Sequence, residues 1–219
     1  MTAREVDFGQ VELSPEEVAL IAVPSYSGRV PTVAAARLAA MHGNGARAVL
    51  LCVYGNRAYE DTLVELRDKA SGAGFKVIAA VAAVAEHSIA RQYAAGRPDA
   101  EDEAMLRSFA ARIRRKIDDG GLDEPVIPGN RPYRKAAGAG IVPKATRACV
   151  KCGLCAAKCP VGAIDAKEPA RVDKSCISCM RCVAVCPHHA RRVNRLLLAL
   201  VGRMLKKACS QRKACELYL

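Results

Sequence analysis

Two stretches of the sequence, CVKCGLCAAKCP at residues 149–160 and CISCMRCVAVCP at residues 176–187, decide the fold of the C-terminal part of the chain. In each stretch two residues separate the first three cysteines from one another, three residues separate the third from a fourth, and proline follows. Three cysteines at this spacing can hold three corners of a cubane iron-sulfur cluster, while the fourth reaches toward the cluster of the other stretch. The pattern therefore predicts two [4Fe-4S] clusters.

The crossed position of the fourth cysteine predicts that each cluster takes ligands from both stretches. We expect the first cluster to be held by Cys149, Cys152, Cys155 and Cys186. We expect the second cluster to be held by Cys176, Cys179, Cys182 and Cys159. The two stretches also align as an internal repeat, which is typical of a bacterial two-cluster ferredoxin domain with pseudo-twofold symmetry.

Zinc is an alternative, because structural zinc sites also use cysteine pairs, closed into tetrahedral sets of four. Zinc would leave the middle cysteine of each triplet, Cys152 or Cys179, without a role. A disulfide framework is a second alternative, but no secretory signal or oxidising context is visible in the sequence. Iron-sulfur clusters account for all eight cysteines, and we expect them here.

Length and composition set the size and location of the protein. The chain has 219 residues, of which 51% are hydrophobic and 4% aromatic, enough for one sizeable core and a small second domain. No apolar stretch approaches the roughly 18 residues of a membrane span. Residues 1–10 lack the basic start and apolar stretch of a signal peptide, so we expect a cytoplasmic protein.

The formal net charge of +12 belongs to the cysteine-rich part of the chain. Residues 1–142 contain 18 basic and 18 acidic residues, whereas residues 143–219 contain 16 basic and 4 acidic residues. This charge favours an acidic redox partner protein at the docking site. Nucleic acid is the rival partner, although no known reader motif or aromatic platform accompanies the charge. The cations also offset the negative charge of the two clusters.

The part before the cysteines has the pattern of an α/β domain with a parallel sheet of about three strands. Short, continuous apolar runs predict strands buried on both faces at residues 18–23, 48–53 and 76–84. Amphipathic stretches predict helices at residues 32–41, 59–71 and 99–119. The predicted fold class is therefore α/β followed by an α+β ferredoxin domain.

Ligands of an open parallel sheet bind beyond the carboxyl ends of its strands, and two loops lie at that position. The loops are residues 24–31 (PSYSGRVP) and 54–61 (YGNRAYED). Each contains small residues that let the backbone approach a ligand and a tyrosine able to cover a flat cofactor. Simple turns with packed tyrosines explain the same residues equally well.

Several motifs together resemble the flavodoxin-ferredoxin fusion family of anaerobic bacteria, often called EFR-type ferredoxins. The resemblance rests on the two loops, on EHS at residues 86–88, on GRPD at residues 96–99 and on the double cysteine motif. In that family a flavodoxin-like domain precedes the ferredoxin, and the two loops flank an FMN ring. The resemblance implies flavin contacts at Tyr26, Ser27, Gly28, Tyr54, Gly55 and Asn56.

The N-terminal part of a flavodoxin-like domain is missing from this pattern. The usual phosphate-binding loop between the first strand and helix has no counterpart, because residues 1–14 are polar and carry no buried strand. In the flavodoxin strand order the loss would leave residues 18–23 as a hydrophobic sheet edge. Exposed edges favour pairing, so we expect a homodimer, a second chain or a truncated gene product.

The composition divides the chain into four segments. We expect a truncated flavodoxin-like domain at residues 1–119, a Pro/Gly-rich linker at 120–145, a ferredoxin domain at 146–191, and an amphipathic helix with a tail at 192–219. The helix, at residues 192–207, has one basic and one apolar stripe. It should dock on the protein, although a basic amphipathic helix also suits an anionic membrane surface.

The sequence contains no paired carboxylates, nucleophile with a base, or glycine loop for phosphates that would indicate catalysis. We therefore expect an electron carrier rather than an enzyme, with Cys52, Cys209 and Cys215 as thiols outside the clusters. Two alternatives remain: an FMN-dependent oxidoreductase fed by the clusters, and a redox sensor whose clusters regulate binding to nucleic acid or a partner.

Overall fold

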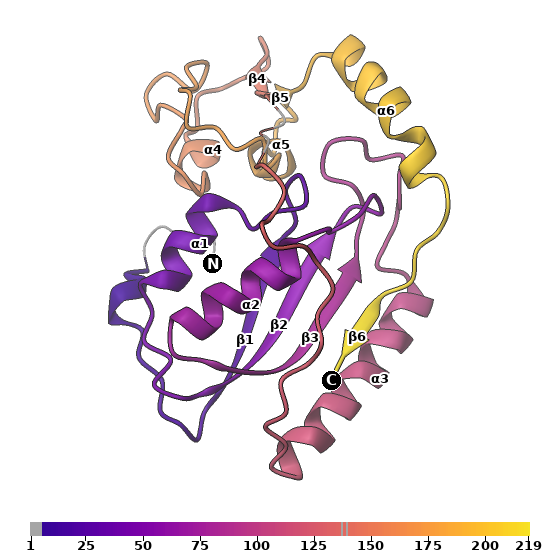
Figure 1. Ribbon diagram of the computed structural model, residues 1–219. Coiled ribbons are helices and arrows are strands. Elements are labelled where there is room, and N and C mark those ends of the chain that lie inside the picture. Colours follow the sequence, from indigo (N-terminus) through magenta and orange to yellow (C-terminus); the bar gives the residue numbers. More distant parts are fainter. Residues whose placement is uncertain (1–5, 137, 139) are drawn as a thin grey trace.

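The computed structural model describes residues 6–136, 138 and 140–219 (Figure 1). An α/β layer forms one end of the molecule, and the cysteine-rich segment lies above the carboxyl ends of the strands (Figure 1). The sheet contains the parallel strands β1 (Val18–Pro24), β2 (Arg47–Tyr54) and β3 (Lys76–Val84). All three strands are where the apolar runs predict them, because consecutive apolar residues can be buried on both faces of a parallel sheet.

The sheet has a fourth strand that the sequence analysis did not foresee. β6 (Glu216–Tyr218) returns from the end of the described chain and pairs antiparallel with β3, giving the order β1-β2-β3-β6. The strand β1 forms the other edge, where Leu20 is 68% exposed. The edge position of β1 is the one that the sequence predicts. β6 is short and carries few apolar residues, so the sequence around it does not predict a strand. Its pairing depends on contacts with β3, which is far away in the sequence.

Three helices flank the sheet, and each begins or ends differently from its prediction. They are α1 (Thr32–Ala39), α2 (Thr62–Gly72) and α3 (Ala100–Asp118). α2 starts later than expected because Glu60, at φ 45°, has a left-handed backbone that cannot belong to a helix. α3 starts with a capping box, in which Asp99 and Asp102 each accept a hydrogen bond from the other's backbone N–H.

The internal repeat of the cysteine-rich segment is visible in its backbone. The short helices α4 (Leu154–Ala157) and α5 (Arg181–Ala184) follow Gly153 and Met180, which align in the repeat and both have left-handed φ angles, 76° and 58°. β4 (Lys144–Ala145) and β5 (Arg191–Arg192) pair antiparallel and join the two ends of the segment. The segment is therefore a closed unit with two similar halves.

The linker predicted at residues 120–145 runs along α2 and carries regular structure only in β4, among its described residues. The buried carboxylate of Asp61 accepts hydrogen bonds from the backbone N–H groups of Asn130, at 2.8 Å, and Arg134, at 2.7 Å. The guanidinium of Arg131 binds Asp68 through two further hydrogen bonds. These bonds fix residues 130–134 of the linker on α2.

The C-terminal helix α6 (Arg195–Cys209) docks less completely than its amphipathic pattern predicts. It begins after Asn194, whose side chain caps it, because residues 191 and 192 belong to β5. Gly202 and Cys209 are its buried residues, whereas Leu196 and Met204 are 82% and 74% exposed. Within the predicted apolar stripe, Leu200 and Met204 are 56% and 74% exposed, so the helix contacts the rest of the protein through only part of that stripe. No helix in the described part of the chain is long and apolar enough to cross a membrane.

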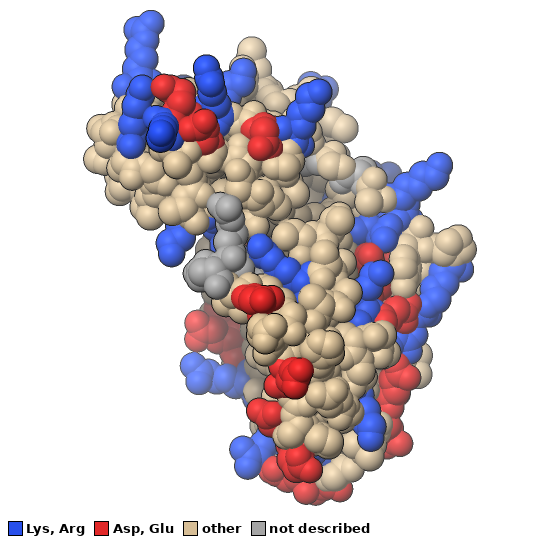
Figure 2. Space-filling view, turned by 90° about the vertical axis from the view of Figure 1, so that its left-hand side faces the viewer, with Lys and Arg blue, Asp and Glu red and all other residues tan. Residues whose placement is uncertain are grey.

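Figure 2 shows how the charge is distributed over one face of the molecule. Lysine and arginine side chains project from the upper part, which holds the cysteine-rich segment, and acidic side chains gather near the opposite end (Figure 2). This distribution follows the charge counts of the two parts of the sequence.

Candidate cluster sites and the adjoining pocket

The structure places the eight cysteines of the two stretches around two cavities, four to each cavity. The first cavity is lined by Cys149, Cys152, Cys155 and Cys186, together with apolar residues and Arg191. The second cavity is lined by Cys159, Cys176, Cys179 and Cys182, again with apolar residues and Arg191. In each set three cysteines come from one stretch and the fourth from the other, because α4 and α5 pack against each other. These are the same sets of four that the crossed spacing assigns to the two clusters, and their binding of clusters stays a prediction.

The thiols around these cavities suit a group that brings positive charge with it. Burial raises the pKa of the Cys155, Cys179 and Cys182 thiols, which disfavours a thiolate unless a cation compensates. Burial also acts on Cys186, but hydrogen bonds from backbone N–H groups, among them that of Ala190 at 3.3 Å, lower its pKa overall. Bound iron would supply the charge that the buried thiolates lack.

Among the residues that the structure describes, no three His, Cys, Asp or Glu side chains are arranged around a point that could hold a single metal ion. Four thiols instead surround a space on each side of Arg191.

Residues 148–191 match the family model of a 4Fe-4S dicluster domain. The dicluster domain includes both cysteine stretches and indicates a role in iron-sulfur electron transfer. No curated protein and no solved structure matches the chain significantly.

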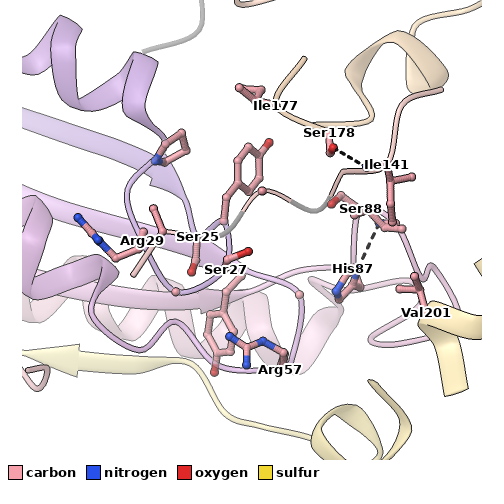
Figure 3. Close-up of a pocket in the computed structure, with 18 of the residues that line it drawn as sticks. Ser25, Ser27, Arg29, Arg57, His87, Ser88, Ile141, Ile177, Ser178 and Val201 are labelled. Atoms are coloured by element: carbon pink, nitrogen blue, oxygen red, sulfur yellow. Dashed lines mark hydrogen bonds between the residues drawn. The ribbon is translucent and has the colours of Figure 1, made fainter. Parts of the chain in front are cut away.

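A pocket of about 630 Å³ lies where the dicluster domain, the sheet and α6 meet (Figure 3). Figure 3 shows Ser27 and His87 from the loops after β1 and β3, Ile177 from the dicluster domain and Val201 from α6 around the same space. Cys176 lines both this pocket and the second cysteine cavity. A molecule bound in the pocket would therefore lie next to a cluster bound in that cavity.

The structure brings five of the six residues with expected flavin contacts to this pocket. They are Tyr26, Ser27, Gly28, Tyr54 and Gly55. The ring of Tyr54 is buried in the core and packs edge-on against Tyr59 at 5.2 Å between ring centroids, so it does not offer a free face for stacking. Asn56 does not line the pocket, because its side chain is 3% exposed and binds the C-terminal tail.

His87 is a pocket residue that the sequence analysis did not single out as a site residue. Its Nδ1 accepts hydrogen bonds from the backbone N–H groups of Ile89, at 3.2 Å, and Ala90, at 3.1 Å, so Nε2 carries the proton in the neutral ring. Burial lowers the pKa of His87 and favours this neutral form. The rule that ligands bind beyond strand ends would have found it, since His87 follows β3.

The cations that line the pocket determine whether it has a free positive charge for a phosphate group. Arg29 binds the buried carboxylate of Glu65 through two hydrogen bonds of 2.7 and 2.8 Å, and Arg57 pairs with Glu60. Of the cations in the described lining, only Lys174 has no carboxylate partner, and it is exposed. The guanidinium groups of the pocket are therefore already paired with carboxylates.

Proposed function

We propose that the protein is an electron carrier with two [4Fe-4S] clusters that exchanges single electrons with a redox partner protein. The observation that carries the proposal is the division of eight thiols into two crossed sets of four around separate cavities. When bound, each cluster supplies one-electron chemistry. The protein holds the clusters, excludes water from them through the apolar cavity walls, and sets their potentials through charge and hydrogen bonds.

Anaerobic purification followed by iron and sulfide analysis tests this proposal. The expected result is about eight irons per chain and a broad sulfur-to-iron absorption that bleaches on reduction with dithionite. Cys155→Ala should damage the first cluster and Cys159→Ala the second, although the two residues lie on the same short stretch. Equal loss of both clusters in either variant would contradict the crossed assignment, and a colourless protein after reconstitution would refute the function.

The proposed partner is an acidic protein that docks on the dicluster domain. The excess of positive charge lies in residues 143–219, and exposed cations project from that part of the surface (Figure 2). Electrostatic steering of this kind weakens as salt screens the charges, with a Debye length of about 10 Å at 0.1 M. The rate of electron exchange with an acidic redox protein should fall several-fold between about 0.05 and 0.5 M salt, whereas exchange with a neutral dye should not change.

We propose as a second function that the protein, as a member of the flavodoxin-ferredoxin fusion family, uses a flavin beside its clusters. The pocket favours this, because it contains residues of both predicted loops and shares Cys176 with the second cavity. A flavin there would convert two-electron chemistry into single-electron steps. FMN and riboflavin should bind with Kd values within about threefold of each other, since Arg29 and Arg57 are already paired and give the phosphate little binding energy. Absence of binding by either flavin would refute this second function.

A second copy of the chain, or another chain, is proposed to cover the exposed edge of the sheet. β1 presents the exposed apolar side chains of Val18 and Leu20, and its outer edge pairs with no other strand of the described chain. Edges of this kind pair readily, and a charged residue prevents pairing. Leu20→Lys should convert a dimer into a monomer in light scattering, and a native protein that is already monomeric would refute pairing between copies.

A further inference from the structure

Arg191 is a buried cation at the centre of the dicluster domain. The residue is 2% exposed and is the largest of the fully buried side chains. It lines both cysteine cavities, the first beside Cys186 and the second beside Cys182. Its backbone is fixed by β5, which pairs Arg191 with Ala145 of β4. The guanidinium therefore lies between the two sets of thiols in a defined position.

The hydrogen bonds of this guanidinium are incomplete. One terminal nitrogen, Nη1, donates to the carbonyl oxygen of Pro169 at 2.5 Å. The Nε–H is buried and has no hydrogen-bond partner among the described residues. A buried cation without a counter-charge is strongly unfavourable. Its place in the fold implies an anionic neighbour that the side chains alone do not supply.

The thiols of both cavities are the groups that experience this charge. The Arg191 side chain hydrogen-bonds the thiol of Cys182 at the second cavity, and the backbone N–H of Arg191 hydrogen-bonds the thiol of Cys186 at the first. Arginine suits such a position better than lysine, because its charge is delocalised and its five N–H donors can serve two sides of a plane.

We propose that Arg191 is a counter-charge shared by the two clusters, and that it sets both of their reduction potentials. The proposal rests on the proposed function, since it requires a cluster in each cavity. Reduction adds one negative charge to a cluster, so a fixed cation beside it favours the reduced form. The Nε–H of Arg191 would be available as a donor to a bound cluster, and a hydrogen bond of that kind would act in the same direction. Because Arg191 lines both cavities, one side chain raises two potentials.

The test compares Arg191→Gln with Arg192→Gln in the cluster-loaded full chain. Arg192 is the next residue in β5, is exposed, and binds the carbonyl of His189, so its variant makes the same charge change at the surface. Both potentials are measured by redox titration with electron paramagnetic resonance and visible absorption. In Arg191→Gln the ratio of reduced to oxidised form at a fixed potential should fall about tenfold for each cluster, a shift of about 59 mV to lower potential. In Arg192→Gln the shift should be less than a third of this.

Arg191→Lys keeps the charge and serves as the second variant. It should assemble both clusters and keep most of the native ratio of reduced to oxidised form, even if Arg191→Gln fails to assemble them. Unchanged potentials in Arg191→Gln, a shift in one cluster only, or failure of Arg191→Lys to assemble clusters would overturn the inference. A native protein without clusters would refute the proposed function as well, whereas loaded clusters that ignore Arg191→Gln would refute only this inference.

Discussion

Replacing Asn56 tests whether this residue belongs to the pocket or to the anchoring of the C-terminal tail. Its Nδ2 group donates to the carbonyl oxygens of Cys209, at 2.9 Å, and Gln211, at 2.8 Å, and its Oδ1 accepts from the backbone N–H of Lys213 at 3.1 Å. Asn56→Gly is the suitable change, because the φ angle of Asn56 is 62° and glycine adopts that conformation without strain.

The three hydrogen bonds to the tail set the expected magnitude, because the fourth, which Oδ1 accepts from Arg97 Nη1, is long at 3.5 Å. Each contributes about 1 kcal/mol net, so the free energy of unfolding should fall by about 3 kcal/mol, and less if water reaches the freed backbone groups. With a typical urea dependence for a protein of this size, the loss moves the unfolding midpoint by about 1 M. The amide of Leu217 in β6 should also exchange its hydrogen faster, because β6 follows directly after the released segment.

Urea unfolding followed by circular dichroism, with hydrogen exchange of residues 210–219, measures both effects. Gln211→Ala is the matched control, since it removes an exposed side chain of the same segment but keeps the carbonyl that Asn56 binds. A loss in Asn56→Gly below about 0.5 kcal/mol, equal to that of the control, would refute the anchoring role. Weaker riboflavin binding with unchanged tail exchange would instead favour a direct contact with the ligand.

Three further predictions concern other contacts of the fold. The guanidinium of Arg97 lowers the pKa of the buried Asp102 carboxyl. The ion pair therefore contributes its full stabilisation above the unfolded-state pKa of about 3.9. This stabilisation is lost as the pH falls through the lower pKa of the folded state. Asp102→Asn should flatten this acid dependence in urea unfolding at pH 2 to 6, and an unchanged slope would contradict the assignment. Gly55→Ala places a Cβ 2.8 Å from the Cα of His87, so the two loops must move apart. Riboflavin binding should therefore weaken about tenfold or more. An unchanged Kd would show that this loop is not part of the binding site. Ser178→Ala removes the hydroxyl that accepts a hydrogen bond from the buried backbone N–H of Ile141 in the linker, and should lower the free energy of unfolding by about 1 kcal/mol. Chemical denaturation measures this loss, with Ser175→Ala, at an exposed serine, as the control.

The features that the sequence predicts well depend on local patterns. β3 follows from nine residues that are nearly all apolar, and the two cysteine sets follow from a spacing that is typical of bacterial two-cluster ferredoxins. The features that it misses depend on partners far away in the chain. Asn56 has the composition of a turn or ligand residue, and only the returning tail makes it a structural anchor.

Arg191 is a second residue whose role the sequence alone does not reveal. In the sequence it is one of several basic residues after the second cysteine stretch, next to Arg192, and nothing local distinguishes the two. The β4–β5 pairing turns one side chain between the cavities and the other to the surface. Alternation along a strand gives opposite directions to neighbouring residues, but the sequence alone does not say which residue faces inward.

The pairing of β6 with β3 has a consequence for how this protein is made. β3 leaves the ribosome before the dicluster domain and β6 leaves it afterwards, so the domain is a long insertion between two neighbouring strands. Until synthesis has passed the last cysteine, the apolar edge of β3 has no partner and is open to misassembly with other chains. The sheet is therefore completed only after the whole dicluster domain has been synthesised.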